Sequence, residues 1–314
     1  MAGLKGTLVL ARARLSAGLG YPVFVSGEGH GRVVVLLSGM GEGPLSLGYT
    51  EELCERLDRA EWGLALPYLA SSWRGVGVSS LDEDARLVVD ACRCLSSVYG
   101  VREVVVMGHS TGAQGVVAVA RLLAGMREQG DPYEPLPEFA GCILQGAVSD
   151  RDWATSVFGA AEMERCIKGA RKVPPEQVLK DSDLPSAAGG EVQLGRYLDT
   201  PLSAGRFLSL YAKGGDDDMF SDDLNEQELG TALHWLRAYP SLIVLSGADE
   251  YCVDTMTHDA RLQRFAAAAS SASGLVPAVR TVVLDGAVHC PRGVHATSLC
   301  NQVVDFVTNG LALS

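Results

Sequence analysis

A serine flanked on each side by a glycine two residues away stands between an apolar run and a helix-compatible run. Residues 104–107 are apolar, Ser110 is the centre of Gly-His-Ser-Thr-Gly, and residues 113–126 can form a helix. A strand, a sharp turn and a helix around a serine predict a nucleophile elbow, which projects the serine Oγ from the sheet. Glycines are needed there because a Cβ would collide with a neighbouring element. An ordinary helix-capping serine is the alternative.

Two further residues could activate such a serine. A serine hydroxyl needs a neutral imidazole to accept its proton and a carboxylate to orient that imidazole. Asp249 follows the apolar run at 241–246, and His289 follows the last such run, at 279–284. If both runs are parallel strands, the side chains meet at one edge of the sheet in the order serine, acid, histidine. The sequence therefore predicts a catalytic triad of Ser110, Asp249 and His289.

Other residues compete for the supporting roles. For the acid, Glu250 and Asp254 are alternatives to Asp249, which the tight turn before it aims first at the cleft. For the base, His295 is the alternative to His289. Each remaining histidine falls in a predicted helix, before an earlier strand, or beside the serine and facing away from it. They are His30, His109, His234 and His258.

A glycine-rich loop follows the apolar run at 32–37. Its sequence, SGMGEG (38–43), has neither the spacing of a phosphate-binding loop nor the following lysine, and it lacks a dinucleotide fingerprint. At this place in the sheet, the loop can supply a backbone N–H to a tetrahedral oxyanion. We expect the amides of Met40 and Thr111 to be the two oxyanion donors. A plain connection between a strand and a helix is the alternative.

Composition limits the class of protein. The chain has 314 residues, of which 47% are hydrophobic and 20% charged, and a net charge of −12. These values are typical of a globular protein, and the acidic balance argues against nucleic acid or an anionic membrane as a partner. There is no apolar core of a secretory signal, and no run approaches the roughly 18 apolar residues of a membrane span. With eight cysteines and no C-x-x-C pair, we expect reduced thiols and a cytoplasmic location.

The order of apolar runs predicts the fold class. Runs at 6–14 and 21–26 favour a hairpin at a sheet edge. Further strands are expected at 32–37, 62–69, 104–107, 141–148, 241–246 and 279–284. Helices are expected at 47–60, 81–99, 113–126, 224–239, 255–272 and 295–308. This alternation predicts an α/β fold with a doubly wound, mostly parallel sheet and an antiparallel N-terminal edge.

The alternation breaks between residues 150 and 230, which contain no clear strand. Aromatic residues in this stretch favour a folded lid over disorder. We therefore expect a core of residues 1–150 and 236–314 with a lid inserted at 151–235. Residues 216–223 of the lid hold five acids in eight positions. A cation site is one interpretation, but the stretch lacks EF-hand spacing, and a solvated acidic loop whose Ser221 or Asp222 caps the next helix is favoured.

Several of these segments also resemble a known family. The chain resembles an α/β-hydrolase over nearly its full length, and in particular a eukaryotic family of domains of unknown function that includes fungal siderophore esterases of the fusarinine type. The segments that carry the resemblance are LLSGMGEG (36–43), SSWRGVGVSS (71–80), VVVMGHSTGAQ (104–114), RFLSLYAKGGDDDMFSDDL (206–224) and LSGADEYC (245–252). Superfamily members often have His-Gly in the first loop, where this chain has Ser38-Gly39. The resemblance implies ester hydrolysis, and siderophore chemistry belongs to some members only.

Together these features predict a serine hydrolase that cleaves a small-molecule carboxylic ester. The chemistry requires no metal and no organic cofactor. A hydroxamate ester of the siderophore type is one candidate substrate. A peptidase or thioesterase with the same triad is an alternative, as is a binding protein that keeps the fold without turnover. The sequence leaves the oligomeric state open.

Overall fold

One sheet organises the chain. The computed structural model describes residues 4–12, 20–27, 29–129, 136–180, 183, 200–270 and 279–311. Within these residues, eight strands pair in the order β1-β2-β4-β3-β5-β6-β7-β8. They are β1 (Thr7–Arg12), β2 (Gly20–Ser26), β3 (Arg32–Leu37), β4 (Gly63–Pro67), β5 (Glu103–His109), β6 (Glu138–Gln145), β7 (Ser241–Ser246) and β8 (Val279–Leu284). The pairs β1–β2 and β2–β4 are antiparallel and the others parallel, which confirms the predicted fold class.

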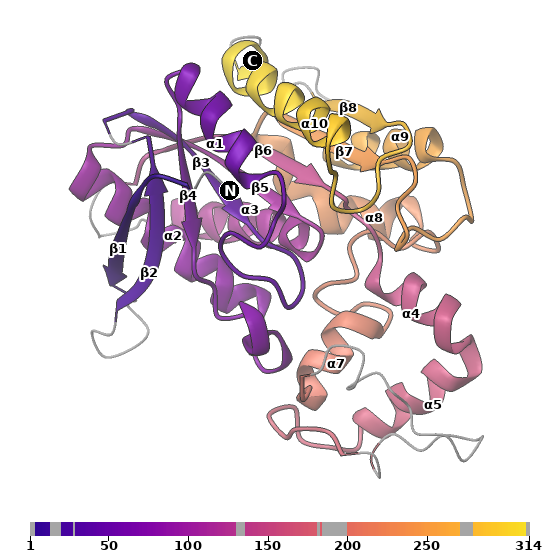
Figure 1. Ribbon diagram of the computed structural model, residues 1–314. Helices are drawn as coiled ribbons and strands as arrows, with labels where there is room; N and C mark the ends of the chain where they lie inside the picture. The colour runs from indigo at the N-terminus through magenta and orange to yellow at the C-terminus, as the bar shows by residue number, and fades with distance from the viewer. Residues whose placement is uncertain are drawn as a thin grey trace.

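Helices cover both faces of the sheet (Figure 1). The helices against the core are α1 (Thr50–Arg59), α2 (Leu81–Tyr99), α3 (Thr111–Gln129), α8 (Glu226–Leu233), α9 (His258–Ala269) and α10 (Val294–Asp305), with the shorter turns η1 (Trp73–Gly77), η3 (His234–Ala238) and η4 (Phe306–Gly310). On β3, Val33 and Val35 pack in the cluster with α2 and α3, whereas Val34 and Leu36 pack in the cluster with α1 and α10. Burial on both faces explains the continuous apolar runs. No helix in the described ranges is long and apolar enough to cross a membrane.

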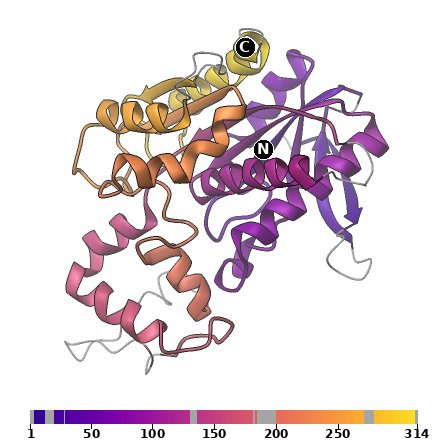
Figure 2. The same cartoon turned by 180° about the vertical axis from the view of Figure 1, so that it is seen from behind.

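A smaller helical lobe is inserted between β6 and β7. We call its described residues, 150–180, 183 and 200–212, the insert. It contains α4 (Asp150–Phe158), α5 (Ala160–Ala170) and α7 (Ala204–Tyr211), and Figures 1 and 2 show these helices apart from the sheet. The insert has an apolar cluster of its own, formed by Ala154, Met163, Cys166, Ala170, Leu202, Phe207, Leu210 and Tyr211.

The end of the insert differs from the expected lid boundary at residue 235. Met219, Phe220 and Leu224 are buried in the same apolar cluster as α3 and α9, as are Leu229 and Leu233 of α8. The core therefore resumes well before residue 235. The sequence pattern did not reveal this, because the apolar spacing of α8 fits either a lid helix or a core helix.

The helix expected at 224–239 is also divided into α8 and the 3-10 turn η3. Its cap is neither Ser221 nor Asp222. Asn225 Oδ1 accepts hydrogen bonds from the backbone N–H groups of Gln227 and Glu228, and Glu228 Oε2 accepts from the Asn225 backbone, which completes a capping box.

The acidic stretch at 216–223 is not the solvated loop that its charge predicted. Asp217 and Asp218 are buried. Arginines from other elements pair with its carboxylates: Arg206 with Asp217 at 2.5 Å, Arg151 with Asp218 at 3.0 Å, and Arg261 with Asp222 at 2.6 Å. In the described part of the chain, no group of His, Cys, Asp and Glu is arranged to hold a metal ion. Arginine side chains therefore balance the charge, and the stretch joins the insert to the core.

Candidate active site

The turn between β5 and α3 holds Ser110 in a strained conformation. The φ angle of Ser110 is +56°, a left-handed value that few non-glycine residues adopt. A Cβ on Gly108 would lie 2.0 Å from the Gly112 carbonyl oxygen, and one on Gly112 would lie 2.5 Å from that of Leu37. The Ser110 amide donates to the Gln145 carbonyl at 2.9 Å, which ties the turn to the end of β6. The geometry is that of a nucleophile elbow.

The turns after β7 and β8 bring the predicted acid and base together. His289 Nδ1 lies 2.8 Å and 2.9 Å from the two carboxylate oxygens of Asp249. Both side chains are buried. Asp249 Oδ1 also accepts from the Tyr251 amide at 3.0 Å, which fixes the orientation of the carboxylate. The Ala248 amide donates to the Ala287 carbonyl at 2.8 Å and joins the two turns directly.

The competing residues lie elsewhere. Glu250 Oε2 accepts from the backbone N–H of His289 at 2.9 Å, so this carboxylate holds the histidine loop rather than the imidazole. Asp254 is exposed. His295 is not among the described residues that line the cavity beside Ser110. The structure thus pairs Asp249 with His289.

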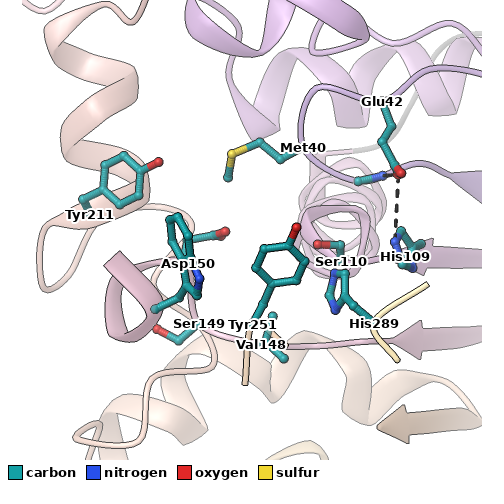
Figure 3. A pocket seen from close by; sticks show the side chains of 12 residues that line it. Met40, Glu42, His109, Ser110, Val148, Ser149, Asp150, Tyr211, Tyr251 and His289 are labelled. Atoms are coloured by element: carbon teal, nitrogen blue, oxygen red, sulfur yellow. Dashed lines mark hydrogen bonds and ion pairs between the residues drawn. The ribbon is translucent and has the colours of Figure 1, made fainter. Parts of the chain in front are cut away.

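A cavity of about 140 Å³ lies over these residues (Figure 3). Of the predicted site residues, Ser110, His289 and Met40 line it, and the figure shows Ser110 and His289 next to each other. Thr111 lines a separate small cavity of about 20 Å³. The complete lining of the larger cavity is Gly39, Met40, Glu42, His109, Ser110, Val148, Ser149, Asp150, Trp153, Tyr211, Tyr251 and His289.

The loop after β3 is closed by reciprocal bonds. The Glu42 amide donates to the Gly39 carbonyl at 3.1 Å, and the Gly39 amide donates to Glu42 Oε2 at 2.9 Å. Gly39 packs against Ser110, because a Cβ on Gly39 would lie 2.9 Å from Ser110 Cβ. Neither the Met40 amide nor the Thr111 amide has a hydrogen-bond acceptor among the residues that the structure describes. Thr111 directly follows Ser110, and Met40 lines the same cavity as Ser110, so we expect both amides to be available to a ligand oxygen.

His109 was wrongly predicted to face away from the site. Its ring centroid lies 4.9 Å from that of His289, and the ring lines the cavity. His109 Nδ1 bonds to Gln145 Oε1, and Gln145 Nε2 donates to the His289 carbonyl at 3.0 Å. Burial, followed by the nearby His289, lowers the pKa of His109 to about 3, so its imidazole is neutral at physiological pH. His109 therefore supports the loop that carries His289.

A sequence signal for this contact did exist. His109 and Gln145 are the polar last residues of two apolar strands, and β5 and β6 pair in a register that places them side by side. Polar residues at the carboxyl ends of adjacent parallel strands meet at the ligand-binding edge of such a sheet.

Asp150 is the second site residue that the sequence did not reveal. It is the first residue of α4 and lines the cavity. Gln114 Nε2 donates to Asp150 Oδ2 at 3.2 Å. Burial and the nearby Asp217 carboxylate raise the pKa of Asp150 to about 7. No feature of the nearby sequence distinguishes this aspartate, because the residues that surround it in space come from α3 and from the stretch after the insert.

Comparison with known proteins places the chain in a family. The family described as "Protein of unknown function (DUF1749)" matches residues 5–308. The chain belongs to this family. The resemblance noted in the sequence is thereby confirmed.

Two relatives of this DUF1749 protein are named as esterases. Esterase AN6793 of Emericella nidulans is 29% identical over 236 residues, and the match spans 62% of this chain and 61% of that protein. Fusarinine C esterase sidJ of Aspergillus fumigatus is 28% identical over 269 residues, covering 74% of this chain and 75% of the relative.

A solved structure shares the fold. The siderophore hydrolase EstB from Aspergillus fumigatus superposes with a TM-score of 0.70 at 23% identity, over 99% of this chain and 98% of that chain. This similarity establishes the α/β-hydrolase fold.

Proposed function

We propose that the protein is a carboxylic ester hydrolase that forms an acyl-enzyme on Ser110. The pair of Asp249 and His289, buried beside a serine at φ +56°, is the observation that carries the proposal. Because the Asp249 carboxylate accepts a hydrogen bond from Nδ1–H of His289, the proton of the neutral ring stays on Nδ1, and Nε2 carries the free lone pair. That tautomer is the one that can accept a proton from serine.

The reaction follows in two halves. His289 takes the Ser110 proton as Oγ attacks the ester carbonyl, and the oxyanion accepts hydrogen bonds from the Met40 and Thr111 amides. The C–O bond then breaks, and His289 donates its proton to the leaving alcohol. In the second half His289 deprotonates a water that attacks the acyl-enzyme, which releases the acid and restores Ser110. No step requires a metal or an organic cofactor.

The relatives support an ester as the substrate, and two of them name a substrate class. Fusarinine C esterase sidJ and the siderophore hydrolase EstB are both similar to this chain over most of its length. We therefore propose that the natural substrate is an ester of the hydroxamate siderophore class.

The insert is proposed to act as a lid over this substrate. Asp150, Trp153 and Tyr211 reach the cavity from the insert, so the insert forms one wall of the space that the ester would occupy. A wall on a separate lobe can exclude water when substrate binds.

Hydrolysis of matched substrates tests the function. We expect the wild type to cleave p-nitrophenyl butanoate, and Ser110→Ala, His289→Ala and Asp249→Asn each to lower kcat by about a thousandfold or more. Equal thermal melting of the four proteins would exclude misfolding. Retained turnover in Ser110→Ala would contradict the proposal.

The butanoyl thioester and anilide separate this function from a thioesterase or a peptidase. We expect kcat/KM to be highest for the oxygen ester. Fusarinine C, followed by chromatography of the released monomers, tests the siderophore assignment. A faster thioester or anilide would replace the esterase proposal with one of these alternatives.

A further inference from the structure

The cavity beside Ser110 has an unusual balance of charge. Two carboxylate residues, Asp150 and Glu42, line it, and a third carboxylate, that of Asp249, lies behind His289. Among the described residues that line the cavity, none is a lysine or an arginine. A neutral ester has no need of such an acidic surrounding, and the proposed mechanism uses only Asp249.

Asp150 is the carboxylate that is free to meet a ligand. Figure 3 shows its side chain among the residues around the cavity, on the wall formed by the insert. Gln114 holds one oxygen at 3.2 Å, and no other donor in the described ranges bonds to the carboxylate. Glu42 is held by two groups, because its Oε2 accepts from the Gly39 amide at 2.9 Å and lies 3.9 Å from His109 Nε2.

Arg206, the cation that faces Asp150, is shared with other carboxyl groups. Arg206 Nη1 lies 2.5 Å from Asp217 Oδ2, and its Nε donates to the Val76 carbonyl at 3.1 Å. The same guanidinium also faces Asp84 and Asp150, so three carboxyl groups share one cation. Burial raises the pKa of Asp84 to about 6 and, with Asp217, that of Asp150 to about 7. A second positive charge supplied by a ligand would relieve this imbalance.

Aromatic rings complete the wall next to Asp150. The Tyr251 ring centroid lies 4.8 Å from that of His289 and 5.9 Å from that of Trp153. Tyr211 lines the cavity as well. Aromatic faces beside a carboxylate are the surroundings that bind ammonium groups, because the ring quadrupole attracts a cation.

We propose that this cavity binds an ammonium group of the ester substrate, held by the Asp150 carboxylate and the aromatic rings of Trp153 and Tyr251. The substrate class is an ester that carries a protonated or quaternary amine in its acyl or its alcohol part. The inference extends the proposed esterase function, and Asp150 acts in it as a specificity residue.

Two pairs of esters test the charge preference. One pair is the p-nitrophenyl ester of γ-trimethylammoniobutanoate and the neutral ester in which carbon replaces the nitrogen. The other is choline butanoate and its carbon isostere. We expect the charged ester of at least one pair to have a kcat/KM about tenfold above that of its isostere. Asp150→Asn should bring the ratio close to one.

Asp152→Asn is the matched control. This substitution removes a carboxylate from the same helix. Asp152 accepts a hydrogen bond from the Asp222 amide and is not among the described residues that line the cavity. Its charged-to-neutral ratio should equal that of the wild type. A wild-type ratio near one in both pairs, or an unchanged ratio in Asp150→Asn, would overturn the proposal.

The pH dependence of the same ratio tests the wild type without substitution. A pH effect on the catalytic step that both esters of a pair share cancels in their ratio. We expect the ratio to rise as pH increases through about 7, because deprotonation of Asp150 creates the charge. The groups that face Asp150 are Asp217, Arg206 and His289. A ratio that stays flat between pH 5.5 and 8.5 would contradict the assignment.

Binding separates this inference from the esterase proposal. Calorimetric titration of Ser110→Ala with choline butanoate needs no turnover. We expect binding that is lost, or weakened about tenfold, in Ser110→Ala/Asp150→Asn. Binding of this kind in a protein that hydrolyses no ester would support the cation site and refute the enzyme. Hydrolysis of neutral esters by a protein that does not bind choline butanoate in this way would support the enzyme and refute the cation site.

Discussion

At the scale of the residue, the site is built from side chains that the surroundings hold in costly states. Ser110 adopts φ +56°, a conformation that costs about 1 to 3 kcal/mol, and two glycines make room for it. His109 is buried without charge, and Asp150 is a carboxyl group with a raised pKa. Such residues are concentrated at functional sites because the rest of the fold compensates for them.

The buried neutral His109 predicts a loss of stability in mild acid. Its pKa is about 3 in the folded protein and near 6.5 when unfolded. Between these values the unfolded chain binds a proton that the folded chain does not, so the free energy of unfolding falls as pH falls below about 6.5. From pH 7 to pH 5 the wild type should lose about 2 kcal/mol that His109→Asn does not lose. Urea denaturation of both proteins at each pH measures the difference.

The relevant quantity is how the difference between the two unfolding free energies changes with pH, because the other titrating groups are present in both proteins. Parallel pH dependence of the two unfolding free energies would show that His109 is not held neutral by burial.

At the scale of the element, the insert is joined to the core by buried ion pairs. Arg206 of α7 and Asp217 are both buried, and Ser209 Oγ donates to the same Asp217 oxygen at 2.6 Å. Removal of one partner from a buried pair costs about 3 to 5 kcal/mol, since the other charge is left uncompensated. Arg206→Met should therefore destabilise the protein by about this amount, with the insert opening first, as limited proteolysis would detect.

Two further variants make this prediction specific. Arg206→Met/Asp217→Leu should recover much of the lost stability, because it removes both charges. Lys168→Met breaks an exposed pair with Glu164 in α5 and should have little effect. An Arg206→Met protein as stable as the wild type would show that this pair does not anchor the insert.

Element positions were largely predictable, and the exceptions have one cause. The apolar runs at 32–37 and 241–246 became β3 and β7, because strands buried on both faces need such runs. The prediction of a solvated loop at 216–223 was wrong because its arginine partners, Arg151 and Arg261 among them, lie far away in the sequence. The local sequence pattern indicates whether a segment is a helix or a strand, but it does not indicate which distant residues the segment contacts.

At the scale of the whole molecule, topology explains why the serine, acid and histidine positions could be predicted. Each side chain follows a parallel strand, and the carboxyl ends of parallel strands meet at one edge of the sheet. The tight turn before Asp249 favours this residue over Glu250 as the acid, and in the structure Asp249 bonds to His289. Asp150 could not be predicted, because its role depends on how the insert packs over that edge of the sheet. The spacing of nearby residues does not indicate this packing.

The most direct measurement is to locate the residue that a fluorophosphonate probe modifies. The probe reacts with an activated serine, and trypsin cleavage should release residues 103–121, in which Ser110 is the one serine. We expect mass spectrometry to find the adduct on Ser110, with labelling absent in Ser110→Ala and about a thousandfold slower in His289→Ala. An adduct on another residue, or hydrolysis of esters by a wild type that is never labelled at Ser110, would contradict the proposed mechanism.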